Sequence, residues 1–276
     1  MEHFGTVQQP ESAGILERYV VQDCSDTTPT FVEHLARYDF AKTELKKGME
    51  VLDAACGSGY GSYLLAQHGC RVTGGDISTE AVAMANQDFH HDRLNYQVLD
   101  VTHLDVADQS FDAYVSFETI EHFANQEEYL LEAARVVKRD GLFLSSTPNK
   151  SVHDFYRAQG WMQPNPYHVK ELQVEEFRDL LERHFQEVRL YSEKLDPLWQ
   201  LALELRRQVS ELQWQLDRLP ATFLKSFLSK LRKGRERADS KSRRPGGVTL
   251  DMIKIGATYL DKSDVVIAVC RRPRVV

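Results

Sequence analysis

Between Glu50 and Pro148 the sequence alternates short apolar runs with longer segments of helical periodicity. Each apolar run has the length of a buried strand and ends in a polar residue or a turn. The predicted strands cover residues 49–56, 71–76, 94–100, 111–117 and 141–149, and the predicted helices between them cover 60–69, 78–91 and 127–138. Strands that alternate with helices indicate right-handed β-α-β units. We therefore predict an α/β fold in which helices cover both faces of a mostly parallel sheet.

The flanking segments extend this pattern in both directions. An amphipathic helix is predicted over 31–46, a helix over 174–185, and strands over 187–194 and 264–272. Residues 197–247 begin with helical periodicity and end in a basic, linker-like stretch, and we interpret them as a helical insertion, because the strand at 264–272 is needed to complete the sheet. The predicted parts are a helical cap over 1–48, a core over 49–196 and 248–276, and the insertion over 197–247.

Composition excludes several classes of protein. With 42% hydrophobic residues among 276, the chain can bury a core and is not a disordered chain. No stretch approaches the roughly 18 apolar residues of a membrane span, and no secretory signal is visible, so we expect a cytoplasmic protein. The four cysteines form no C-x-x-C pair and are expected to be buried thiols rather than disulfides or zinc ligands.

Charge is concentrated in one segment. Residues 221–244 contain nine basic and two acidic side chains and carry +7; because the whole chain carries −7, the remainder carries −14. Because the chain outside residues 221–244 is this acidic, we do not expect a general nucleic-acid binder, and contacts with polyanions should be local. The basic segment has an apolar side, so it can contact the inner face of a membrane, a phosphorylated acceptor or RNA phosphates, or it can simply be solvated. The preceding apolar stripe, from Trp199 to Leu219, can pack on its own domain or on a second subunit of a homodimer.

A ligand site is indicated where the first predicted strand enters a glycine-rich turn. Gly57 and Gly59 would let the backbone approach a ligand closely. The dinucleotide fingerprint G-x-G-x-x-G is not fully matched, because Ser62 stands where the third glycine would be. Asp53, at the end of the strand, would repel a pyrophosphate and suits a cationic ligand better.

Two further acids follow the next two predicted strands. Asp76 stands where an acid commonly accepts hydrogen bonds from ribose hydroxyls, and the oxygens of Asp100 could accept from an adenine amino group. Each acid alone could be an ordinary turn residue. In register with the glycine turn, these two acids together with Asp53 predict a nucleoside site.

These motifs resemble those of the class I S-adenosylmethionine-dependent methyltransferases. The likeness rests on the segments 53–59, 75–78, 111–112 and 146–149 together with Asp100, and it covers about residues 30–195 plus the last strand. It implies a Rossmann-like sheet of seven strands with the last strand antiparallel, and S-adenosylmethionine as the cofactor. It implies that Gly57 and Gly59 line the methionine part of the cofactor, that Asp76 holds the ribose, and that Asp100 with Val101 frames the adenine. The other cofactor-binding residues that it implies are Asp53, Ile77 and Phe117.

A set of carboxylates and imidazoles follows the fourth strand. If a helix starts there, Glu118 and His122 share one face, with Glu121 beside them, and His168 lies in a later loop. Oxygen and nitrogen ligands suit Mg²⁺, Mn²⁺ or Fe²⁺. The set resembles the E-x-x-E-H plus distal histidine of small-RNA terminal 2′-O-methyltransferases and, in its first part, ubiquinone-biosynthesis O-methyltransferases. The resemblance implies Glu118, Glu121, His122 and His168 as metal ligands.

Two other interpretations of this set remain open. In one, His122 is a metal-free general base and Glu118 is the other catalytic residue. In the other, the segment has a purely structural role and caps a helix.

The acceptor is predicted from weaker likenesses. The segments Glu17–Val20, Asn165–Val169 and Ile267–Arg272 resemble bacterial methyltransferases associated with sugars and cell-surface polysaccharides. We therefore expect methyl transfer to a hydroxyl of a saccharide or a carrier-linked glycan, as in polysaccharide biosynthesis. The alternatives are a terminal 2′-O-methyltransferase of RNA, disfavoured by the acidic body, a methyltransferase of small metabolites, and a non-catalytic scaffold.

Overall fold

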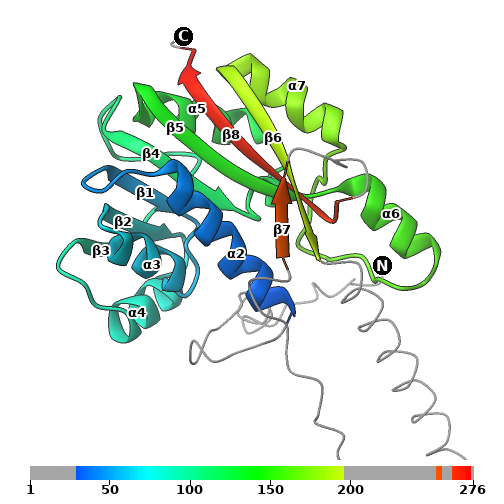
Figure 1. Cartoon of the computed structure of the whole chain (residues 1–276), viewed down its shortest axis with the longest axis horizontal. Coiled ribbons are helices and arrows are strands. Elements are labelled where there is room, and N and C mark those ends of the chain that lie inside the picture. Colours follow the sequence, from blue (N-terminus) through cyan, green and yellow to red (C-terminus); the bar gives the residue numbers. More distant parts are fainter. Residues whose placement is uncertain (1–28, 196–252, 257–262, 275–276) are drawn as a thin grey trace, which may run out of the picture.

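The computed structural model describes residues 29–195, 253–256 and 263–274. One sheet runs through it, with helices packed on both faces (Figure 1). The strands are β1 (Glu50–Ala54), β2 (Arg71–Asp76), β3 (Leu94–Val98), β4 (Phe111–Phe117), β5 (Val137–Pro148), β6 (Phe185–Leu195), β7 (Ile253–Gly256) and β8 (Val265–Pro273). The helices are α2 (Pro29–Glu44), α3 (Tyr60–His68), α4 (Thr79–Asp88), the 3₁₀ turn η1 (Ile120–His122), α5 (Gln126–Val136), α6 (Lys150–Ala158) and α7 (Val174–His184).

The strand order is β3-β2-β1-β4-β5-β8-β6-β7. The pairings from β3 to β5 are all parallel, whereas β8 lies antiparallel between β5 and β6. This arrangement confirms the predicted α/β sheet of seven strands with an antiparallel last strand. The short strand β7 adds to it by pairing antiparallel with the edge of β6.

Neighbouring residues of a strand face opposite sides of the sheet, which produces two cores. Leu52 and Tyr114 face α5 and α7, where they pack with Phe177 of α7 and other fully buried side chains. Their chain neighbours Val51 and Val115 face α2 and α3 on the other side. These strands are buried on both faces, as expected of a parallel sheet covered by helices.

Helices α3 and α4 begin within one residue of the predicted starts and have defined capping residues. Ser78 Oγ accepts the Ala81 N–H at 3.2 Å at the start of α4, and Gly69 ends α3 with a φ of 112°. Helix α6 was not among the predicted helices, and none of its residues is fully buried. The cysteines that the structure describes, Cys56, Cys70 and Cys270, are buried free thiols, as predicted.

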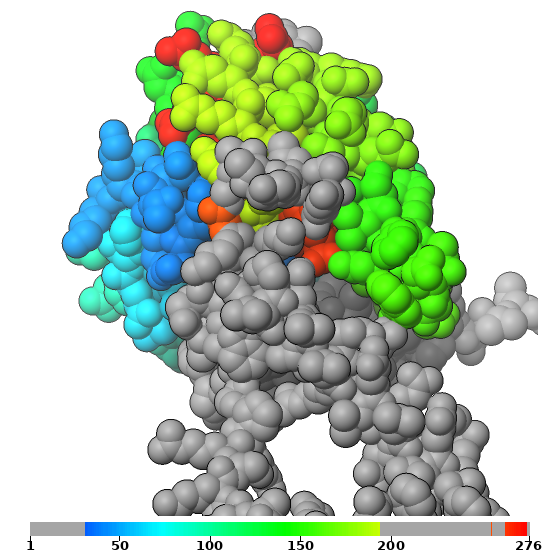
Figure 2. Space-filling view, turned by 45° about the vertical axis from the view of Figure 1, so that its right-hand side comes forward, coloured from blue at the N-terminus to red at the C-terminus, as the bar shows by residue number. Residues whose placement is uncertain are grey.

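The carboxyl ends of β1, β2, β4 and β5 lie at one edge of the sheet, where ligands bind in open α/β folds. Because β8 is antiparallel, the residues that enter it share this edge with the end of β6: Glu193 and Pro148 both pair with Val265. Figure 2 shows β7 and the chain entering β8 (orange to red) between α2 (blue) and α6 (green). Among the described residues, no helix is long and apolar enough to cross a membrane.

Candidate active site

The turn after β1 is held in left-handed backbone conformations. Ala55, Gly57 and Gly59 have φ angles of 58°, 55° and 87°. A Cβ added at Gly59 would lie 2.6 Å from the Ala85 Cβ and 2.7 Å from the Tyr96 hydroxyl, so only glycine fits there. A Cβ at Gly57 would meet no protein atom within 4 Å, so this side of the turn is open to a ligand.

Asp53 lies beneath the turn with only 1% of its surface exposed. Its carboxylate accepts hydrogen bonds from Ser62 Oγ at 2.6 Å and from the Tyr38 hydroxyl at 3.2 Å. Burial raises the pKa of Asp53 to about 7. The predicted carboxyl group is present, its charge depends on pH near neutrality, and the protein itself contacts both of its oxygens. Ser62, which replaces the third glycine of the fingerprint, has the role of orienting this carboxylate, and Tyr38 contributes from α2.

Asp76, at the end of β2, links the glycine turn to the start of α4. Its Oδ2 accepts the Gly57 N–H at 3.0 Å and its Oδ1 accepts the Ser78 N–H at 2.9 Å. Ile77 follows with 65% of its surface exposed, so a ligand at this edge could cover it. Asp76 thus shapes the turn, in addition to the predicted contact with a ribose.

The remaining predicted cofactor residues differ in their exposure. Asp100 is exposed and accepts hydrogen bonds from the backbone and side chain of Thr102. Val101, predicted to frame an adenine, is 6% exposed and packs in the core on the α5 side. Phe117 is 7% exposed, and the centroid of its ring lies 5.2 Å from the centroid of the Tyr38 ring.

The segment after β4 does not continue as the expected helix. Glu118 has a φ of 52°, a left-handed conformation that cannot start an α-helix, and only a single 3₁₀ turn follows at 120–122. The expectation that Glu118 and His122 share a helical face is therefore wrong. The Glu118 side chain turns instead to β5, where its Oε1 accepts Ser146 Oγ at 2.6 Å.

The structure brings together three of the four predicted metal ligands. Side-chain ligand atoms of Glu121, His122 and His168 all lie within 4.8 Å of one another, and Glu118 does not join this group. The two imidazole rings lie with their centroids 5.2 Å apart. The predicted set is corrected to these three residues, because the positive φ of Glu118 directs its side chain to Ser146.

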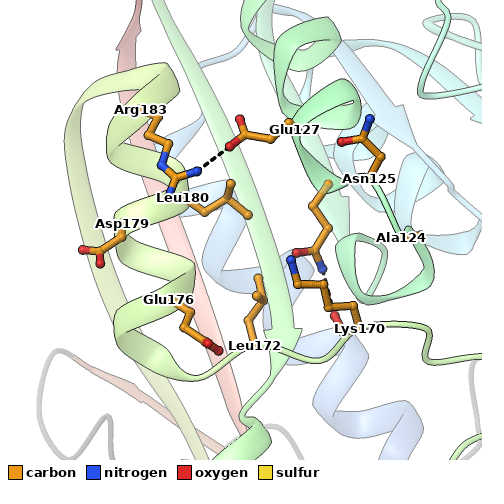
Figure 3. A pocket seen from close by; sticks show the side chains of 10 residues that line it. Ala124, Asn125, Glu127, Lys170, Leu172, Glu176, Asp179, Leu180 and Arg183 are labelled. Atoms are coloured by element: carbon orange, nitrogen blue, oxygen red, sulfur yellow. Dashed lines mark hydrogen bonds and ion pairs between the residues drawn. The ribbon is translucent and has the colours of Figure 1, made fainter.

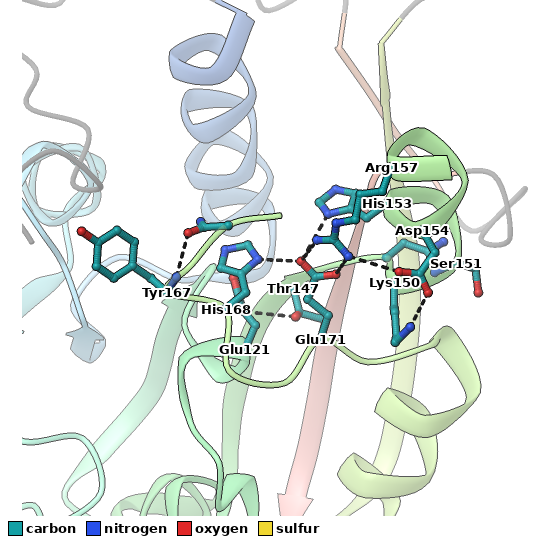
Figure 4. A network of polar contacts seen from close by, with 12 residues as sticks. Glu121, Thr147, Lys150, Ser151, His153, Asp154, Arg157, Tyr167, His168 and Glu171 are labelled. Atoms are coloured by element: carbon teal, nitrogen blue, oxygen red, sulfur yellow. Dashed lines mark hydrogen bonds and ion pairs between the residues drawn. The ribbon is translucent and has the colours of Figure 1, made fainter. Parts of the chain in front are cut away.

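Both histidines are oriented through the same ring nitrogen. His122 Nδ1 lies 3.0 Å from the Tyr167 carbonyl oxygen. His168 Nδ1 lies 2.7 Å from Glu171 Oε1 (Figure 4). Each acceptor requires a proton on Nδ1, which leaves Nε2 of each ring with its lone pair. Metal-binding histidines in proteins are commonly held in this way.

Glu171 is itself held by a second residue from α6. Arg157 donates from both terminal nitrogens, at 2.8 Å and 2.5 Å, and His153 Nδ1 lies 3.5 Å from the same carboxylate. Although burial opposes ionisation, the hydrogen bonds from Arg157 and His168 lower the pKa of Glu171 to about 2. No motif marked Glu171 or Arg157 in the sequence, because their roles depend on how the loop folds back.

The donor set fits a divalent cation. Glu121 is fully buried; its Oε2 accepts Thr147 Oγ1 at 3.1 Å, while its Oε1 has no hydrogen-bond partner. Burial, and then the nearby Glu118 carboxylate, raise the pKa of Glu121 well above its usual value. A divalent cation held by Glu121, His122 and His168 would satisfy the buried carboxylate.

A pocket of about 390 Å³ lies between the start of α5 and the face of α7 (Figure 3). It contains both charge signs: Arg183 donates to Glu127 at 2.6 Å across it, and Lys170, Glu176 and Asp179 line it. These charges compensate one another, so the pocket does not indicate one ligand class.

Comparison with known proteins supports the interpretation of the cofactor side. Residues 52–145 match the family model described as a methyltransferase domain. A protein of Mycolicibacterium smegmatis, named as a probable S-adenosylmethionine-dependent methyltransferase, is 38% identical over 141 residues, which are 49% of this chain and 51% of that protein. The ubiquinone biosynthesis O-methyltransferase of Coxiella burnetii is 35% identical over 107 residues, covering 38% of this chain and 46% of that one. The chain thus spans about half the length of the curated relatives it matches.

The fold agrees with these matches. An S-adenosylmethionine-dependent methyltransferase from Thermotoga maritima aligns with a TM-score of 0.56, at 14% identity, over 88% of this chain and 92% of that one. The Rossmann-like architecture is therefore that of the methyltransferase fold. The match over residues 52–145 and the fold thus agree in indicating a methyltransferase domain.

Proposed function

We propose that the protein is an S-adenosylmethionine-dependent O-methyltransferase that methylates a sugar hydroxyl of a saccharide or carrier-linked glycan, assisted by a divalent metal. The observation that carries this proposal is the meeting, at one sheet edge, of the acid-lined glycine turn and the Glu121–His122–His168 cluster. The turn suits a nucleoside with a sulfonium cation. The cluster suits a metal that positions and acidifies a hydroxyl.

In the reaction, the acceptor oxygen attacks the methyl carbon in line, the carbon–sulfur bond breaks, and its electron pair stays on sulfur. A cation held by Glu121, His122 and His168 would lower the pKa of the accepting hydroxyl. Asp53 and Asp76 orient the turn that binds the cofactor, and the sulfonium charge is favoured beside their carboxylates. Since Glu118 lies outside the cluster and is half-buried at the same edge, its carboxylate can take the proton that the hydroxyl loses.

The sugar acceptor and the predicted partners rest on sequence features. A net charge of −14 outside residues 221–244 disfavours RNA as the acceptor. Peripheral membrane contact through 221–244, a homodimer formed through the segment from Trp199 to Leu219, and a cytoplasmic location remain predictions. The insertion over 197–247 lies outside the described residues, as does most of the predicted cap over 1–48.

A small lipophilic metabolite is the second candidate acceptor. This candidate is favoured by the similarity to the ubiquinone biosynthesis O-methyltransferase of Coxiella burnetii, whose name describes an O-methylating protein. The two candidates agree on the reaction and differ in the acceptor.

The test uses purified protein and methyl-labelled S-adenosylmethionine with three fractions from cells of its source: saccharides and glycolipids, RNA, and small molecules. We expect label in the saccharide fraction, loss of label with EDTA, and recovery when Mg²⁺ or Mn²⁺ is added back. Label in RNA or in small molecules would refute the sugar assignment. Transfer that is unaffected by EDTA and by Glu121→Gln would refute the metal and favour His122 as a metal-free base. Cofactor binding without transfer to any fraction would favour the scaffold.

A further inference from the structure

A buried cluster of charges lies beside the candidate active site, at the same edge of the sheet. Arg37 comes from α2, Glu118 follows β4, and Glu193 lies near the end of β6. Asp264 immediately precedes β8, where Val265 pairs with both Glu193 and the end of β5. Four elements that are distant in sequence therefore place polar side chains where the acceptor must approach the cofactor.

Arg37 connects this cluster to the proposed proton acceptor. Its guanidinium is 2% exposed, and its Nε donates to Glu193 Oε2 at 2.5 Å. Its Nη1 lies 3.9 Å from Glu118 Oε1, which is too long for a hydrogen bond. Glu33, one helical turn earlier in α2, interacts electrostatically with Arg37, Glu118 and Asp264.

Three buried polar atoms of this cluster have no hydrogen-bond partner: Arg37 Nη1, Glu193 Oε1 and Asp264 Oδ1. Arg37 and Glu193 are 2% and 4% exposed, so bulk water does not satisfy these atoms. Buried polar groups in proteins nearly always have a partner. Since Glu33, Glu118 and Asp264 are only half-buried, the cluster is not closed to a small polar ligand.

The charges restrict what such a ligand can be. One guanidinium faces the carboxyl groups of Glu33, Glu118, Glu193 and Asp264, so a phosphate or carboxylate would be repelled. The unpaired Arg37 N–H requires an acceptor. Burial raises the pKa of Glu193 to about 8, so its unpaired oxygen can accept from a hydroxyl in the ionised form or donate to one in the protonated form. Hydroxyl groups meet both requirements at once, and neighbouring hydroxyls of a sugar ring can meet them side by side.

We propose that Arg37 and Glu193 form the acceptor subsite, which binds hydroxyls of a neutral sugar next to the hydroxyl that is methylated. This inference rests on the proposed function and specifies its acceptor: a neutral sugar residue at this point, with any phosphate of a carrier held elsewhere. Glu118 then lies between the subsite and the cofactor turn, as a proton acceptor must.

The test measures sugar binding by saturation-transfer NMR on the full chain with bound S-adenosylhomocysteine. The probes are the methyl glycosides of glucose, galactose, mannose and rhamnose, with glucose 6-phosphate and galacturonate as anionic counterparts. We expect at least one neutral glycoside to bind and both anionic sugars to bind at least tenfold more weakly. Glu193→Gln, which is nearly isosteric, and Arg37→Lys should weaken neutral sugar binding at least tenfold. Arg135→Lys, in an ion-pair network between α5 and the segment before β4, should not.

Each outcome bears on the subsite separately from the methyl transfer. Titration with S-adenosylhomocysteine shows whether each variant keeps its fold, and the comparison of neutral with anionic sugars needs no variant. Absence of neutral sugar binding, tighter binding of an anionic sugar, or equal binding by Glu193→Gln and Arg135→Lys would each overturn the subsite. Label transfer to the saccharide fraction would still support the proposed function in any of these cases.

Discussion

Replacing the two glycines of the turn after β1 by alanine should separate the cost to folding from the cost to cofactor binding. Both Gly57 and Gly59 have positive φ, so an alanine at either costs about 1–2 kcal/mol of stability. At Gly59 the new Cβ would also lie 2.6 Å from the Ala85 Cβ, and overpacking adds about 1–3 kcal/mol. We therefore expect Gly59→Ala to lower the free energy of unfolding by about 2–5 kcal/mol, and Gly57→Ala by only about 1–2 kcal/mol.

The effect on cofactor binding is expected to be clearest for Gly57→Ala, the variant with the smaller cost in stability. The Cβ of Gly57→Ala points into the open side of the turn, so it should weaken S-adenosylhomocysteine binding at least tenfold, about 1.4 kcal/mol, in a protein that remains folded. Gly160→Ala is the matched control, because Gly160 has a φ of 72° and likewise no neighbour within 4 Å, but follows α6. It should cost similar stability and leave binding unchanged.

Urea unfolding gives the stabilities and calorimetric titration gives the affinities. If Gly57→Ala bound S-adenosylhomocysteine as tightly as the unaltered protein, the open side of the turn would not be the ligand side. If Gly59→Ala and Gly160→Ala were equally stable, the neighbours of Gly59 would have room to move, and the packing argument would fail.

Three further predictions test other parts of the site. Asp76→Ala removes the acceptor of two backbone N–H groups, and calorimetry should show S-adenosylhomocysteine affinity falling more than tenfold, whereas unchanged affinity would contradict its role. Because burial raises the pKa of Asp53 to about 7, its carboxyl is neutral below this pH and charged above it; S-adenosylmethionine affinity should rise between pH 6 and 8, and Asp53→Asn should flatten this rise in the same titration. Glu171→Gln loses the charge that orients His168, so Mn²⁺ affinity measured by calorimetry should fall by about 10–100-fold, while the exposed control Glu175→Gln should have no effect.

Local sequence was sufficient for most of the framework. Strand 111–117 and strand 71–76 have the predicted bounds, and α3 and α4 begin within one residue of the predicted starts. These features depend on neighbours within a few residues. The helix α6 and the strand β7 were not predicted; β7 is a four-residue strand at the sheet edge, and its place there depends on pairing with β6.

The same distinction applies to the candidate site, where some features could be predicted from local sequence and others could not. The glycine turn, Asp76 and the Glu121–His122 pair could be found from their spacing, since each follows directly from a strand end. Their detailed roles could not, because the backbone of Glu118 turns left-handed and its side chain lies outside the Glu121–His122–His168 cluster.

What the sequence determined by itself is the order of strands and helices and the set of chemical groups at the strand ends, because periodicity and caps are local properties. The tertiary structure alone decided which of those groups meet. Arg37 pairs with Glu193 across 156 residues, and Arg157 orients His168 through Glu171. Such pairs depend on sheet order and on loops that fold back over its edge, so no short segment of the chain encodes them.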